Sequence, residues 1–145
     1  MIANERQLRI TKAALREFEE ALARLDTVEA HRPPEMRRVM REAIESQLQE
    51  LREQLAEYDA LQSGKVSVLE LDSLDALPDA LIRARIAAGV TQKKLAERLG
   101  LKEQQIQRYE ATRYAGVSLE RIGAVVEALG VKIRERVILP SASGE

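Results

Sequence analysis

The stretch TQKKLAERLGLKEQQIQRYE, from Thr91 to Glu110, decides how this chain is interpreted. Its first part predicts a short helix, because Leu95, Ala96 and Leu99 follow helical spacing on one face. Gly100 comes directly after them, and glycine adopts a positive φ without steric cost. We therefore expect two short helices joined by a tight turn.

The second helix of this stretch, Lys102 to Glu110, has little to bury. Only Ile106 and Tyr109 are expected to face a core, which leaves a polar face of Glu103, Gln104, Gln105, Gln107 and Arg108. Amides and guanidinium groups can bond the edges of DNA bases in pairs. A helix-turn-helix unit lays its second helix in the major groove, so the pattern predicts DNA binding.

Composition narrows the function further. The 145 residues include no cysteine and one histidine, which leaves few side chains for a thiol nucleophile or a transition-metal site. We therefore expect no enzyme activity, no metal and no cofactor.

The net charge of -1 hides an asymmetry between the two halves of the chain. Residues 1–77 hold 11 Lys and Arg against 16 Asp and Glu, a balance of -5, whereas residues 78–145 hold 12 against 8, a balance of +4. The basic half contains the polar helix, as contact with phosphates requires.

The N-terminal half predicts an antiparallel helical hairpin. Asn4 is a good N-cap for a first helix, whose heptad pattern ends before the prolines at 33 and 34. A second heptad helix is expected from Pro34 to about Leu61. The hairpin is interpreted as a dimerisation arm, with a docking surface for a different protein as the alternative.

Four segments follow from these patterns: a hairpin over 1–65, a linker over 66–76, a helical domain over 77–139 and a disordered tail over 140–145. Ser73 is expected to cap the first helix of that domain. Residues 66–71 alternate weakly, as a short strand or an extended linker, and residues 131–139 alternate apolar and charged side chains, as a strand does. The predicted fold class is mainly all-α, a hairpin plus a compact helix-turn-helix bundle, and it allows a short C-terminal strand.

Residues 81–131 resemble the Cro/C1-type helix-turn-helix domain, also known as the xenobiotic-response-element family. The resemblance rests on an ordered motif: Arg85, Gly89, Thr91, Gln92, Leu95, Ala96, Leu99, Gly100, Ile106, Tyr109, Glu110, Ser118, Leu119, Ala128, Leu129 and Gly130. It implies a helical bundle that binds operator DNA as a dimer. The sequence departs from the family at Lys102, where Ser or Thr is common, and at Ala111-Thr112, where Asn-Gly is common.

Residue roles follow from that resemblance. Glu103, Gln104 and Arg108 match positions that reach base edges, although Glu103 can equally repel wrong sites. Phosphate contacts and positioning are expected of Thr91, Gln92, Lys93, Lys102, Gln105, Gln107, Thr112, Arg113 and Tyr114. Arg85 and Glu110 match a pair that forms an internal salt bridge, so their expected role is structural.

The sequence as a whole predicts a DNA-binding transcriptional repressor that acts as a homodimer on a two-fold operator. One alternative is an antitoxin that neutralises a toxin through the hairpin and regulates its own operon, given a loose resemblance to antitoxins of the host-inhibition-of-growth type. Another is a helical adaptor that does not bind DNA. No segment has the roughly 20 apolar residues that span a bilayer, so a soluble, cytoplasmic protein is expected.

Overall fold

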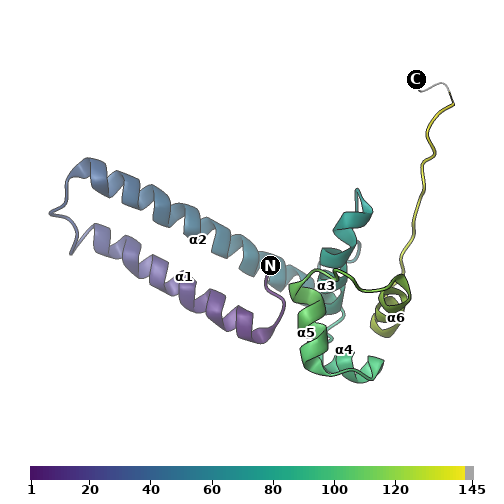
Figure 1. Ribbon diagram of the computed structural model, residues 1–145. Helices are drawn as coiled ribbons and strands as arrows, with labels where there is room; N and C mark the ends of the chain where they lie inside the picture. The colour runs from purple at the N-terminus through teal and green to yellow at the C-terminus, as the bar shows by residue number, and fades with distance from the viewer. Residues whose placement is uncertain (143–145) are drawn as a thin grey trace.

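A long helical hairpin extends from a compact group of short helices (Figure 1). The computed structural model describes residues 1–142, and within them every regular element is a helix, which confirms the mainly all-α prediction. The hairpin consists of α1 (Glu5–Leu25) and α2 (Pro34–Gln62). Asn4 caps α1 by accepting a hydrogen bond from the Gln7 backbone N–H. None of the helices in the described residues is long and apolar enough to cross a membrane.

The seam between α1 and α2 is only partly closed. Leu25 and Leu48 are fully buried, but Leu15, Phe18 and Leu22 on the α1 side are half-buried. Two helices cover an apolar seam from one side each and leave its flanks open to water. The hairpin therefore holds together as an antiparallel pair and still exposes apolar surface along its length.

The compact group begins with a single 3₁₀ turn, η1 (Leu74–Ala76), followed by α3 (Leu77–Ala87). The expectation that Ser73 caps a helix here is wrong. Ser73 precedes η1, its side chain makes no capping hydrogen bond, and α3 begins three residues after η1 does. The helices α4 (Gln92–Leu99), α5 (Glu103–Ala111) and α6 (Leu119–Leu129) complete the bundle.

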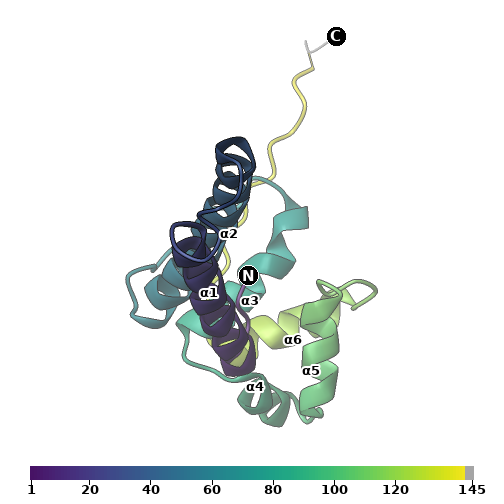
Figure 2. The ribbon, with the colours of Figure 1, turned by 90° about the vertical axis from the view of Figure 1, so that its left-hand side faces the viewer.

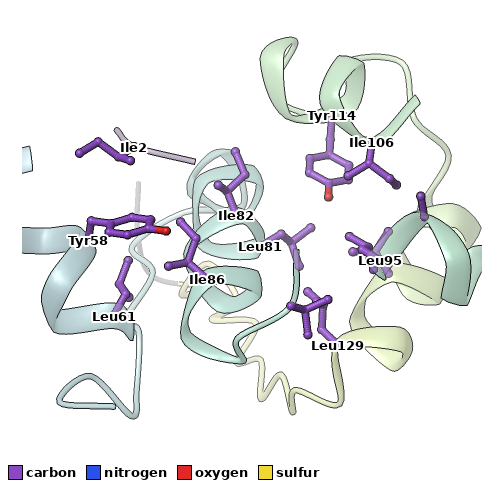
Figure 3. Close-up of a cluster of buried hydrophobic side chains, with 13 residues drawn as sticks. Ile2, Tyr58, Leu61, Leu81, Ile82, Ile86, Leu95, Ile106, Tyr114 and Leu129 are labelled. Carbon is purple, nitrogen blue, oxygen red and sulfur yellow. The ribbon is translucent and has the colours of Figure 1, made fainter. Parts of the chain in front are cut away.

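Helix α3 lies at the centre of the core (Figure 3). Ile2, Tyr58 and Leu61, from the base of the hairpin, lie on one side of it, next to Ile82 and Ile86. The buried side chains of α4, α5 and α6 lie on the other side. One hydrophobic core thus includes both the base of the hairpin and the short helices, across the domain boundary predicted near residue 65.

The two alternating segments do not form strands. Residues 66–71 and 131–139 have no regular secondary structure, and no β-strand occurs within residues 1–142. Figure 1 shows the chain after α6 running away from the body as an extended thread. A lone strand is unstable without a hydrogen-bonded neighbour, and neither segment has one here. Of the predicted disordered tail, residues 143–145 lie outside the described residues.

Candidate nucleic-acid interface

The α4–turn–α5 unit is fixed from inside by two side chains. Leu95 of α4 and Ile106 of α5 are both 0% exposed. Gly100 has a φ of 67°, and the Leu101 backbone N–H then donates to the Ala96 carbonyl over 2.8 Å. At the other end of α4, the Thr91 hydroxyl accepts a hydrogen bond from the Lys94 backbone N–H at 3.0 Å. The angle between the two helices is therefore set by the core and by both ends of α4.

The start of α5 compensates for the lysine at its cap. Lys102 offers no side-chain acceptor to the first turn, but its own backbone N–H donates to Gln105 Oε1 at 2.9 Å. This is half of a capping box, in which a side chain in the first turn reaches back to the cap residue. Gln105 is therefore engaged at the helix start.

A buried polar network holds α5 to α3. The Arg85 guanidinium donates to both carboxylate oxygens of Glu110, at 2.7 and 2.8 Å, and to the Val90 carbonyl at 2.9 Å. Both side chains of this ion pair are only 4% exposed. Gln92 Nε2 donates to Glu110 Oε1 at 3.0 Å, so the first residue of α4 joins the same network. Three helices meet at one carboxylate.

The N-terminal segment closes this network from the outside. Asn4 Nδ2 donates to Gln92 Oε1 at 3.2 Å, and the Arg85 guanidinium also donates to the Ala3 carbonyl. Sequence reasoning missed both contacts, because Asn4 was interpreted only as a helix cap and lies 88 positions from Gln92. Gln92 is consequently buried, with its amide bonded at both ends, so the expected contact of this side chain with phosphate is corrected to the positioning role alone.

The loop after α5 turns sharply and buries one predicted phosphate contact. Arg113 and Tyr114 have φ values of 52° and 56°, which non-glycine residues rarely adopt. The Tyr114 ring packs into the core against Tyr109, with ring centroids 5.7 Å apart, and burial raises the pKa of its hydroxyl. Tyr114 is 4% exposed, so its expected contact with phosphate is corrected to a packing role.

The neighbouring loop residues remain at the surface. The Thr112 hydroxyl donates to the Arg108 carbonyl at 2.9 Å, which secures the last turn of α5. Arg113 is exposed, and its guanidinium lies 3.2 Å from a carboxylate oxygen of Asp79. The Arg113 side chain is 70% exposed and makes this contact through one nitrogen, so its other N–H groups remain open to a phosphate.

The remaining predicted site residues are exposed on and next to α4 and α5, and three of the six are cations. Six exposed side chains could reach the bases or the phosphates of DNA: Lys93, Lys102, Glu103, Gln104, Gln107 and Arg108. Within residues 1–142, Lys93, Lys102 and Arg108 have no carboxylate at ion-pair distance. Residues 1–142 include no group of three or more His, Cys, Asp and Glu side chains that could hold a metal ion. The surface offers amides and unpaired positive charge.

A family model described as helix-turn-helix matches residues 81–136, from the first turns of α3 to the segment beyond α6. This segment is a Cro/C1-type helix-turn-helix domain. The Cro/C1-type domain belongs to DNA-binding regulators of transcription and is not typically enzymatic, which makes the chain a DNA-binding regulator in general terms. The match covers less than half of the chain and leaves the hairpin outside it. No curated protein and no solved structure matched the chain.

Proposed function

We propose that the chain is a sequence-specific repressor that binds a two-fold operator as a homodimer. The observation that carries this proposal is the exposed polar face of α5, which the Arg85–Glu110–Gln92 network holds at a fixed angle to α4. A helix that reads bases needs an exposed polar face and a fixed orientation, because its side chains contact base edges only if they are held in register with the DNA.

Two groups of residues divide the work on DNA. Gln104 and Arg108 read base edges, and Glu103 discriminates by accepting from a base or by repelling wrong sites. Lys93 and Lys102 are unpaired cations at the starts of α4 and α5, where they contact phosphates and set the register. Gln92 takes part by bracing α4 against α5.

Substituting Arg108 and Lys93 is expected to separate reading from positioning. Arg108→Ala should lose about 1–3 kcal/mol of operator binding and accept other base pairs at one position. Lys93→Ala should weaken operator and random DNA alike, because phosphates are the same in every sequence. Competition titrations of both variants against both DNAs measure the difference. An unchanged ratio of operator to random binding in Arg108→Ala would refute the assignment of this residue.

Selection of bound fragments from random DNA tests the function itself. The full chain should enrich one inverted repeat, with half-sites about one helical turn apart. Its affinity for that repeat should fall steeply as salt increases. A flat titration against all fragments at low salt would instead favour an adaptor that does not bind DNA.

The hairpin is the proposed source of the dimer. Its open seam includes a groove lined by Leu22, Leu48 and Ala56, and the exposed charges Arg52 and Glu53 border it. A second hairpin would cover this surface, as in a four-helix bundle. Sedimentation of the purified chain should give the mass of a dimer. A monomer that forms a stable complex with a small toxin on co-expression would support the second candidate function, an antitoxin.

A further inference from the structure

A polar groove lies between the start of the hairpin and the DNA-binding helices. Arg6 and Arg9 of α1 line one wall, and Glu103 and Gln107 of α5 line the other. Figure 2 looks along the hairpin and shows the first turns of α1 beside α4, which agrees with the hydrogen bond from Asn4 to Gln92. The groove therefore adjoins the face of α5 that is proposed to read DNA.

The first turns of α1 hold a group of unpaired cations. Four basic residues stand there with Glu5 as the acidic exception: Arg6, Arg9, Lys12 and Arg16. Within residues 1–142, none of the four lies at ion-pair distance from a carboxylate. On α2, by contrast, Arg38, Arg41 and Arg52 each have a carboxylate partner, and only the fourth arginine of that helix, Arg37, donates to a backbone carbonyl instead. Most of the hairpin's cationic side chains without a carboxylate partner therefore lie on α1.

The other charges of the groove do not supply these partners. Arg85 is paired with Glu110, and Arg113 with Asp79. Glu5 and Glu103 also line the groove, and neither forms an ion pair within the described residues. Arg6 and Arg9 thus border the same groove as two carboxylates and pair with neither, so an added anion would meet two guanidinium groups that are still open.

We propose that Arg6 and Arg9 bind the phosphate backbone of the DNA whose major groove receives α5. The DNA-binding surface would then extend beyond the helix-turn-helix domain onto the first two turns of the hairpin. Guanidinium groups bond phosphate oxygens in pairs, and the backbone bordering the major groove is the polyanion next to α5. This proposal rests on the proposed DNA binding and adds a second anchoring point to it.

The test uses the full chain with a matched control on the same helix. The variant carries Arg6→Gln and Arg9→Gln, and the control carries Arg16→Gln and Arg24→Gln, which remove the same charge from positions that do not line the groove. Binding of each is titrated against the selected operator and a random duplex over a range of salt. Circular dichroism of both proteins checks that they are folded.

Each lost phosphate contact should cost about 5-fold in affinity at 0.15 M salt and make the logarithmic salt dependence shallower by about 0.9. The groove variant should therefore lose roughly 20-fold or more on both DNAs, with a slope shallower by about 1.8, and the control should keep nearly all its affinity. Glu5→Gln should bind DNA more tightly than the unmodified chain.

Two results would overturn the inference. Equal binding by the groove variant and the control would show that α1 does not touch DNA, and tighter binding by the groove variant would show that α1 opposes it. In both cases Arg108→Ala and Lys93→Ala would still report on the helix-turn-helix unit, so the proposed function could survive. Failure of the unmodified chain to bind either DNA would refute both.

Discussion

Glu110→Ala is expected to destabilise the protein by about 3–5 kcal/mol, because it leaves the Arg85 guanidinium buried without its carboxylate. The loss would also release Gln92, which donates to the same carboxylate, and would loosen the α4–α5 angle. Chemical denaturation followed by circular dichroism measures the free energy of unfolding.

Two comparisons make this prediction specific. The double variant Arg85→Met/Glu110→Leu should be less destabilised than Glu110→Ala, since no buried charge is left unpaired. Arg38→Ala, which removes the exposed ion pairs of Arg38 with Glu35 and Glu42, should lower the free energy of unfolding by less than about 1 kcal/mol. A Glu110→Ala protein as stable as Arg38→Ala would mean that water reaches Arg85 and solvates it.

Ile106→Ala should cost about 2–5 kcal/mol of folding free energy, because this side chain is fully buried where α5 meets the core. The cavity would lie directly beneath the reading face, so DNA binding should fall with stability. The urea midpoint of unfolding, compared with that of the unmodified chain, gives the size of the effect.

Gln104→Ala is the matched control for Ile106→Ala, two residues away on the exposed side of α5. It should change the unfolding free energy by less than about 0.5 kcal/mol and still weaken operator binding. If both variants lost DNA binding but kept the same stability, Ile106 would not be a core residue in solution.

Local signals made the central unit predictable from sequence. The spacing of Leu95 and Leu99 and the glycine after them describe a helix and its turn within ten residues of chain. The prolines at 33 and 34 likewise mark the start of α2, as its cap and its first residue. The partners Arg85 and Glu110 were expected only through the family resemblance, because 25 positions separate them and no local rule joins them.

Contacts between distant segments were not predictable. Nothing in the sequence links Asn4 to Gln92, since amide side chains are common on surfaces and at helix caps. The sequence correctly places Tyr114 in a loop but does not indicate that it is buried, because its burial depends on a left-handed backbone path that no local pattern predicts. Alternation at 131–139 suggested a strand, but a strand also requires a neighbour, which alternation alone cannot supply.

The contact of Ala3 and Asn4 with Arg85 and Gln92 has a mechanical consequence. It joins a hairpin whose longer helix measures roughly 44 Å to the bracing residue of the reading unit, so the hairpin acts as a lever arm on that unit. The tip of the hairpin is the loop between α1 and α2. A force applied there would reach the start of α4 by two routes: the contacts of Ala3 and Asn4, and the segment that connects α2 to α3. A partner that binds the tip of the hairpin would therefore act on the position of the helix-turn-helix unit.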